Sequence, residues 1–330
     1  MKQLLLAATV LLALASLARA QDKITLQLKW LPQAQFAGYY VAKDKGFYKD
    51  LGLDVTIKPG GPDVDPGQVI ASGGADVVVD WMPSALAMRE RGVPLVNIAQ
   101  IFQRSGMMLV CRKESGVATP QDFKGHTLAV WFAGNEYPFL AWMDKLGYRT
   151  SGDGGAAVKV LRQGADIDPL LQGQADCVSA MTYNEYWQAL DAGLEPDRLV
   201  TFSYEDQGVA TLEDGLYALD RNLADAAATD RLVRFVKASI KGWDDAVQNP
   251  AEAVKIVLAN GGSGALNEAH QTRMMREVAK LVEGSSRHLG YLDPAAYERT
   301  VRILLSAKSD PVSRRPENAW THRVWEMATN

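Results

Sequence analysis

The sequence is poor in cysteine, and its two cysteines have neither metal-ligand spacing nor the number of a disulfide framework. Cys111 and Cys177 each lie in an apolar, strand-like run. We therefore expect two buried free thiols, with a single bridge as the alternative in an oxidising compartment. The four histidines are scattered without metal-ligand spacing. We expect neither a metal ion nor a cofactor.

Basic clusters and the common catalytic signatures are also absent. The chain has 39 acidic and 35 basic residues and a formal net charge of -4. A mildly acidic chain without a basic run is typical neither of nucleic-acid-binding proteins nor of proteins that bind anionic membranes. The sequence contains no glycine-rich phosphate loop of the P-loop or dinucleotide type and no G-x-S-x-G elbow. These absences exclude the enzyme classes that carry such motifs and leave a binding function open.

Beyond its first residues the chain has no apolar run long enough for a membrane span. The start, MKQLLLAATVLLALASLARA, combines the basic Lys2, an apolar run at 4–17 and a terminal Ala18-Arg19-Ala20. This pattern predicts a secretory signal peptide at 1–20 with an A-x-A cleavage site, and an uncleaved anchor is the alternative. Gln21 follows and offers no lipid-attachment cysteine. We expect a soluble mature protein in the periplasm.

One sequence pattern occurs twice in the chain. ASGGADVVVDWMPSALAMRERGVP, from Ala71, resembles LQGQADCVSAMTYNEYWQALDAGLEP, from Leu171. Upstream of each, ITLQLKW from Ile24 resembles HTLAVWF from His126. Each copy places a strand, a helix and a second buried strand in the same order. The repeat therefore predicts one supersecondary plan used twice, and chance similarity of two α/β lobes is the alternative.

Hydrophobic periodicity fills in both copies. Strands are predicted at 25–29, 53–58, 77–80, 96–102, 107–112, 127–131, 157–161, 177–181, 199–204 and 216–219. Helices are predicted between them at 36–45, 68–72, 83–91, 136–146, 167–172 and 183–192, and the remainder is mainly helical at 224–249, 250–259, 268–283 and 294–305. This alternation predicts an α/β fold with an open, largely parallel sheet in each lobe.

The order of the elements also predicts the division of the chain. We expect a first lobe at 21–110, a second lobe at 111–210, and a return to the first lobe with C-terminal helices at 211–330. Hinges are expected near 109–112 and 208–216.

Aromatic, amide and carboxylate side chains gather where predicted strands end. Open parallel sheets bind ligands outside the carboxyl ends of their strands. Flat rings suit a planar ligand, and a carboxylate beside them suits an amine or an aminopyrimidine. Packing between lobes and helix capping by Asn135 and Glu136 are the alternatives. The candidate ligand-binding residues are Trp30, Asp80, Trp81, Trp131, Asn135, Glu136, Tyr183, Asn184 and Glu185.

Four stretches carry a family resemblance: LKWLPQAQFAGYYVAKDKGFYKDLGLDV, SGGADVVVDWMPSALAMRERGVP, FKGHTLAVW and GQADCVSAMTYNEYW. Together they resemble the periplasmic substrate-binding proteins related to the fungal thiamine pyrimidine synthases, over roughly 24–220. The resemblance implies a type II periplasmic-binding fold, with two doubly wound lobes around a central cleft. It implies a monomeric receptor that delivers a solute to the permease of an ABC importer in the inner membrane. Relatives carry formylaminopyrimidine, a thiamine precursor, or riboflavin, and more distantly sulfonates and nitrate.

The same resemblance supplies an enzyme as the alternative function. The fungal synthases use a lysine that holds pyridoxal phosphate and a histidine that is consumed. Alignment on the SGGAD block places these at Asp80 and Ser84, neither of which can form a Schiff base. The iron-binding cysteine cluster of the synthases has no counterpart either. We therefore expect a binding protein and not an enzyme, with a pyrimidine, a flavin or another flat nitrogen heterocycle as its ligand.

Overall fold

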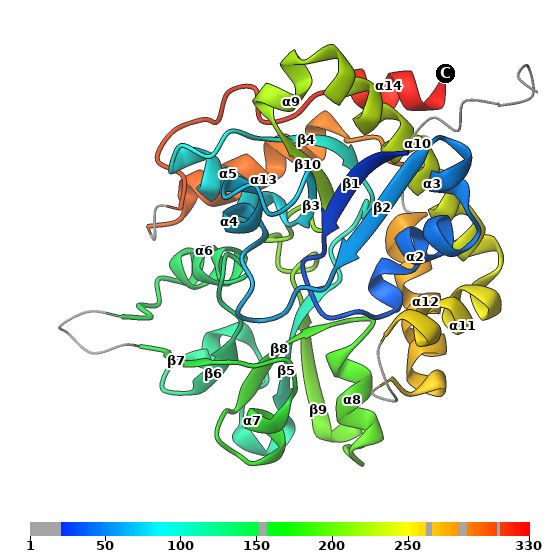
Figure 1. Cartoon of the computed structure of the whole chain (residues 1–330). Helices are drawn as coiled ribbons and strands as arrows, with labels where there is room; N and C mark the ends of the chain where they lie inside the picture. Colours follow the sequence, from blue (N-terminus) through cyan, green and yellow to red (C-terminus); the bar gives the residue numbers. More distant parts are fainter. Residues whose placement is uncertain (1–20, 152–156, 262–265, 284–288, 309–310) are drawn as a thin grey trace, which may run out of the picture.

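A computed structural model describes residues 21–151, 157–261, 266–283, 289–308 and 311–330 of the chain. The predicted signal peptide at 1–20 lies outside the described residues. The described chain forms two five-stranded sheets, which Figure 1 shows one above the other with helices on both sides. Each predicted strand has a counterpart in these sheets, and the ends differ by a few residues.

The two sheets have the same topology. In spatial order the first contains β2 (Leu53–Lys58), β1 (Asp22–Gln27), β3 (Val77–Asp80), β10 (Gly215–Leu219) and β4 (Leu95–Gln100). The second contains β7 (Lys159–Arg162), β6 (Thr127–Val130), β8 (Cys177–Met181), β5 (Met107–Arg112) and β9 (Leu199–Ser203). In both sheets the fourth strand runs antiparallel to its two neighbours. The expected parallel sheets are thus mixed, because each receives one strand from a chain segment that crosses between the sheets.

The sequence repeat is matched by a repeated hydrogen-bond pattern. Asp76 precedes β3, and its carboxylate accepts a hydrogen bond from the Thr25 N–H of β1 at 2.7 Å. Asp176 precedes β8, and its carboxylate accepts from the Thr127 N–H of β6 at 2.9 Å. In both copies the backbone N–H of the aspartate donates back to the carbonyl of the same threonine. The shared G-x-A-D motif therefore fixes the register of the first and third strands of each copy.

Helices cover both faces of the first sheet (Figure 1). One core joins β1 to α2 and α10, and another joins β3 and β10 to α5 and α13. Within the described ranges no helix has the length and apolar character needed to cross a membrane. The helices are α2 (Ala37–Asp44), α3 (Phe47–Asp50), α4 (Pro66–Ala71), α5 (Met82–Glu90), α6 (Tyr137–Leu146), α7 (Asp168–Leu171), α8 (Glu185–Asp191), α9 (Asp220–Ala224), α10 (Ala226–Gln248), α11 (Pro250–Asn260), α12 (Glu268–Val282), α13 (Pro294–Ser306) and α14 (Arg323–Thr329).

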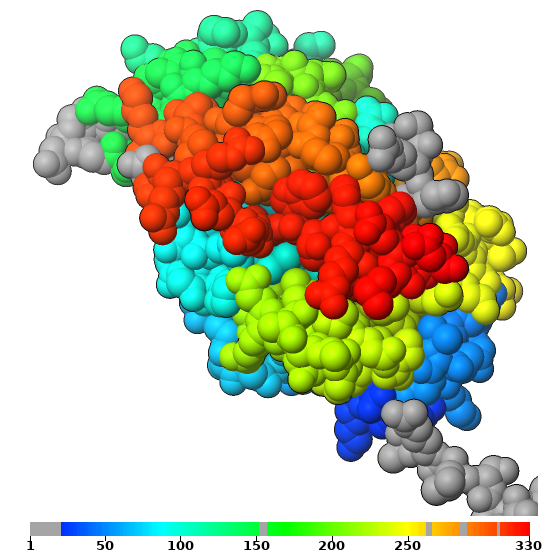
Figure 2. Space-filling model, turned by 90° about the horizontal axis from the view of Figure 1, so that it is seen from above, coloured from blue at the N-terminus to red at the C-terminus, as the bar shows by residue number. Residues whose placement is uncertain are grey.

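The long helix α10 packs closely against α2 because the contact is lined by small residues. Asp225 caps α10 by accepting a hydrogen bond from the Ala228 N–H. A Cβ atom on Gly38 would lie 2.2 Å from the Trp243 ring, and one on Gly242 would lie 2.1 Å from the Gly38 carbonyl oxygen. Two glycines are therefore required at this crossing. Figure 2 shows the C-terminal segment in red beside α10, and α14, which the sequence pattern did not predict, packs against it.

The chain crosses between the sheets at 101–106 and again at 204–214. The predicted hinge near 109–112 falls inside β5, a paired strand of the second sheet, so the first crossing lies earlier than expected. Glu213 joins the two crossings: its carboxylate accepts from the Gly106 N–H at 2.9 Å and from the Ser105 hydroxyl. Burial raises the pKa of Glu213 to about 8, although these hydrogen bonds oppose the shift.

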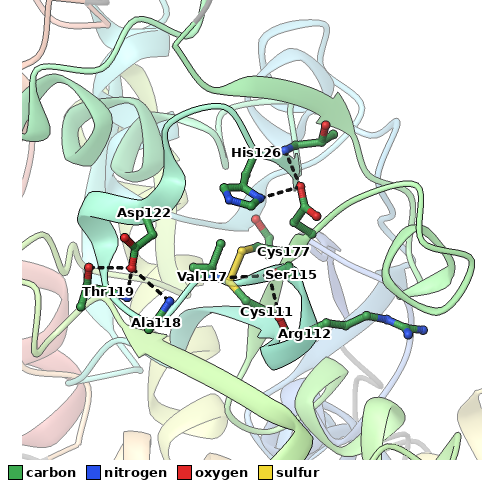
Figure 3. The surroundings of a disulfide bond; sticks show 12 residues. Cys111, Arg112, Ser115, Val117, Ala118, Thr119, Asp122, His126 and Cys177 are labelled. Carbon is green, nitrogen blue, oxygen red and sulfur yellow. Dashed lines mark hydrogen bonds and ion pairs between the residues drawn. A yellow bond between two sulfur atoms is a disulfide. The ribbon is translucent and has the colours of Figure 1, made fainter.

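Cys111 and Cys177 form a disulfide (Figure 3), so the expectation of free thiols was wrong. Cys111 lies on β5 and Cys177 on β8, and the two residues face each other in the antiparallel register. Their Cα atoms are 3.9 Å apart. β5 enters the second sheet from the crossing, between β8 and β9. Sequence spacing alone could not reveal this adjacency, which depends on the order of strands in the folded sheet.

Candidate functional site

A small cavity of about 20 Å³ lies where strands of both sheets end. Trp30 follows β1 and Trp81 follows β3 in the first lobe. Trp131 follows β6 and Tyr183 follows β8 in the second. The carboxyl ends of the strands therefore meet at one place, as the topology predicts. The lining residues are Lys29, Trp30, Gln33, Gln35, Trp81, Trp131, Asn135, Met181, Tyr183, Asn184 and Glu185.

The aromatic walls of this cavity are held in fixed orientations. The rings of Trp30 and Trp131 meet edge to face across the lobes, with centroids 5.8 Å apart. Trp131 Nε1 donates to the Gly164 carbonyl at 2.9 Å. Trp81 Nε1 donates to Asp214 Oδ1 at 2.8 Å. Rings fixed in this way can hold a flat ligand without a large loss of side-chain entropy on binding.

Glu185 places a buried carboxyl on the second-lobe side of the cavity. It is 1% exposed at the start of α8. Its Oε2 accepts from the Met181 N–H at 2.9 Å, and its Oε1 accepts from Asn184 Nδ2 at 2.6 Å. Burial raises the pKa of Glu185 to about 7, although both hydrogen bonds oppose the shift. A carboxylate accepts about four hydrogen bonds, so Glu185 retains capacity for a ligand N–H.

Asn135 supplies a second acceptor to the cavity. Its Nδ2 donates to the Phe132 carbonyl at 2.9 Å, which fixes the amide. Its Oδ1 is buried without a hydrogen-bond partner in the described part of the chain. A buried unpaired acceptor is costly unless a ligand or water satisfies it. Asn135 therefore points to a ligand that carries a hydrogen-bond donor.

Asp80 lies behind the cavity wall and is not among the lining residues. It is fully buried and forms an ion pair with Lys29, whose Nζ lies 2.8 Å from Asp80 Oδ1. The Trp81 N–H donates to the same oxygen at 2.8 Å, and the Ser84 hydroxyl donates to Oδ2 at 3.0 Å. Burial raises the pKa of Asp80, and Lys29 opposes the shift. The residue that lines the cavity is Lys29, which the sequence analysis did not select.

Glu136 is also outside the lining, although its neighbour Asn135 is in it. Its carboxylate accepts from the Gly134 N–H at 2.8 Å and so stabilises the turn that carries Asn135. Gly134 has φ of +93°, and a Cβ atom there would lie 2.6 Å from Ser84 Cβ of the first lobe. Glu136 makes no side-chain hydrogen bond as the N-cap of α6. Its carboxylate therefore supports a turn that touches the opposite lobe.

Sequence reasoning missed Asp214 and Gln35 as well. Asp214 is the last residue of the second crossing, with φ of +36°, and is 2% exposed. It accepts from Trp81 Nε1 and, at 2.8 Å, from Gln35 Nε2, so one carboxylate orients two lining side chains. Burial raises the pKa of Asp214 to about 6, opposed by these two hydrogen bonds and by Lys29. No local pattern marks Asp214, because Trp81 lies 133 residues away in sequence.

Several contacts hold the two lobes together around the cavity. Arg162 on β7 pairs with Asp63 of the first lobe at 3.0 Å. His270 Nε2 on α12 lies 2.8 Å from Asn184 Oδ1 at the start of α8. An outer groove between these helices shares Trp30, Gln33 and Asn184 with the cavity and so adjoins it. Among the described residues no cluster of His, Cys, Asp and Glu is suited to a metal ion.

A family model described as NMT1/THI5 like matches residues 33–253, more than half of the chain. The chain belongs to the NMT1/THI5-like family. It is 26% identical to the formylaminopyrimidine-binding protein of Halalkalibacterium halodurans over 73% of this chain and 71% of that protein. It is 24% identical to the riboflavin-binding protein RibY of Chloroflexus aurantiacus over 87% of this chain and 81% of that protein.

The solved structures that this fold resembles include receptors of importers. The ligand-binding component of an ABC-type import system from Staphylococcus aureus matches with a TM-score of 0.66 and 14% identity, over 93% of this chain and 99% of that one. This NMT1/THI5-like chain thus has the periplasmic-binding-protein fold that its sequence resemblance implies. By contrast, the 4-amino-5-hydroxymethyl-2-methylpyrimidine phosphate synthase THI11 of Saccharomyces cerevisiae is 33% identical over only 31% of this chain and 30% of its own length. The two relatives that cover 73% and 87% of this chain are binding proteins.

Proposed function

We propose that this protein is the solute receptor of an ABC importer and that its ligand is a thiamine-precursor pyrimidine or a similar flat, amino-substituted heterocycle. The observation that carries the proposal is the cavity between the lobes, with aromatic walls and two buried acceptors, Asn135 and Glu185. Rings bind a flat apolar face, and buried acceptors select ligands with N–H donors. An exocyclic amine on a heteroaromatic ring satisfies both requirements.

The cavity between the lobes is small, about 20 Å³, so the lobes must separate to admit any ligand. A single ring requires less separation than a flavin and is therefore the first candidate. A three-ring ligand with a long polar chain needs the outer groove as well. Riboflavin is the second candidate, favoured by the RibY relative and by the groove that adjoins the cavity.

The proposed mechanism is capture by lobe closure. The ligand binds one lobe in an open form, and the other lobe then closes over it about the crossings at 101–106 and 204–214. The ligand favours the closed form only through contacts that the open form lacks. The closed monomer delivers it to a permease in the inner membrane. The disulfide and the similarity to receptors of importers support an extracytoplasmic location. The leader sequence supports a periplasmic location, with cleavage after Ala20.

Truncating the cavity walls should weaken ligand binding without unfolding the protein. Trp131→Ala removes a stacking surface and Glu185→Gln removes a charged acceptor, and each should cost about 1–3 kcal/mol, a 5- to 150-fold increase in Kd. Glu136→Gln is the matched control for Glu185→Gln and should bind nearly as the wild type, because Glu136 lies outside the lining. Calorimetric titration with formylaminopyrimidine measures all three. Unchanged Kd values for both Trp131→Ala and Glu185→Gln would contradict the site.

Ligand affinity should rise as the pH increases through about 7. The pKa of Glu185 is raised to about 7, so below this value its carboxyl is protonated and competes poorly for a ligand N–H. Binding then releases a proton, and affinity falls by up to about tenfold per pH unit below 7 and levels off above it. Titrations from about pH 5.5 to 8.5 check this for the wild type and Glu185→Gln. The variant separates Glu185 from Asp214 and should show a flatter profile; identical profiles would contradict the assignment.

A further inference from the structure

Lys29 is a buried cation on the wall of the cavity. It follows β1, between Leu28 and Trp30, and is 3% exposed. The lining residues include one other charged group, Glu185. A buried lysine is normally tolerated only when its charge is paired, and Asp80 fulfils this requirement. The position of Lys29 on the cavity wall raises the question of what else its ammonium group binds.

The hydrogen bonds of Lys29 leave one donor unused. An ammonium group has three N–H donors and no acceptor. The structure gives Nζ two acceptors, Asp80 Oδ1 at 2.8 Å and the Ala133 carbonyl of the second lobe at 3.4 Å. Asp80 is itself fixed by Trp81 N–H and Ser84, so it holds the ammonium in place. The Trp81 ring centroid also lies 5.9 Å from Nζ, at the outer limit of a cation–π contact. The third N–H has no hydrogen-bond acceptor among the described residues and so has capacity for a ligand acceptor.

The cavity thus combines a fixed donor from the first lobe with acceptors from the second lobe. Asn135 Oδ1 is buried and unpaired in the described chain, and Glu185 retains acceptor capacity. We propose that Lys29 donates its third hydrogen bond to a lone-pair acceptor of the ligand, a ring nitrogen or a carbonyl oxygen. This inference rests on the proposed function and narrows the ligand class. The cavity selects neutral heterocycles that carry both an N–H donor and an acceptor, and it disfavours a ligand with a fixed positive charge beside Lys29.

A cycle between protein variants and ligand analogues tests this pairing. The three probes are formylaminopyrimidine, its analogue with C–H in place of both ring nitrogens, and its analogue with an alkyl chain in place of the formamide. The protein is studied as wild type, Lys29→Met, and Lys29→Met/Asp80→Asn. The double variant removes the carboxylate that Lys29→Met leaves unpaired and so keeps the test valid if the single variant does not fold. Circular dichroism confirms the fold of each.

We expect one of the two analogues to bind the wild type 5- to 150-fold more weakly than the parent. The affinity of that analogue should not fall further when Lys29 is replaced. A purely structural Lys29 would instead give the same ratio of analogue Kd to parent Kd in the wild type and in the variants, because the variants would then weaken all three probes alike. Equal ratios would overturn the inference while leaving the proposed function in place. Failure of the wild type to bind either the parent probe or riboflavin would overturn the proposed function itself.

Discussion

Removing the Cys111–Cys177 disulfide will lower the free energy of unfolding of the second lobe by about 4 kcal/mol. The bridge closes a loop of 66 residues, and the chain-entropy account assigns about this stabilisation to such a loop. It joins β5 and β8, so it also ties the crossing strand into the middle of the second sheet (Figure 3). Urea unfolding in the presence and absence of dithiothreitol measures the effect.

A double variant separates the bridge from other effects of the reductant. Cys111→Ala/Cys177→Ala should unfold at lower urea than the oxidised wild type and should not respond to dithiothreitol. Alanine keeps most of the buried strand contact, so the loss should come mainly from the missing link. A reduced wild type as stable as the oxidised one would contradict a stabilising disulfide in this lobe.

Asp80→Ala will destabilise the first lobe by about 3–5 kcal/mol, because it leaves the Lys29 ammonium buried without a counter-ion. The same change also removes the acceptor of the Trp81 N–H and of the Ser84 hydroxyl. Urea unfolding followed by tryptophan fluorescence measures the loss.

Asp63→Ala is the matched control, since it removes another carboxylate of the first lobe and breaks an ion pair, with Arg162 of the second lobe, that is largely exposed. The side chains of Asp63 and Arg162 are 85% and 60% exposed, and such pairs contribute about 0–1 kcal/mol. We expect a clear difference between the two variants. An Asp80→Ala protein as stable as Asp63→Ala would show that the Lys29–Asp80 pair is not a structural ion pair.

Much of the fold could be predicted from local patterns. The strands of both sheets alternate or run apolar over a few residues, and the helices between them end at glycines such as Gly46 and Gly147, both with positive φ. The repeat could be read because Asp76 and Asp176 perform the same local task in each copy. These features depend on neighbours in the sequence or on one strand-helix unit.

The parts that could not be predicted depend on long-range adjacency. The disulfide requires that β5 lies beside β8, which follows only from the crossing topology. Lys29 and Asp80 are 51 residues apart, and their pairing requires that β1 and β3 are neighbours.

At the site, the strand ends could be predicted from the sequence. The direction in which each side chain points there could not. Asn135 lines the cavity, whereas the adjacent Glu136 bonds its own turn. Adjacent residues in a tight turn point in different directions, and their composition does not say which one faces the cleft.

The central claim is that the cavity between the lobes binds one small amino-substituted heterocycle. Calorimetric titration of the wild-type mature protein with formylaminopyrimidine, riboflavin and an alkanesulfonate tests it most directly. We predict saturable binding of one formylaminopyrimidine per chain, with weaker binding of riboflavin and none of the sulfonate, because an alkanesulfonate has no N–H donor for the buried acceptors Asn135 and Glu185. Tight binding of the sulfonate, with no binding of either heterocycle, would contradict this account.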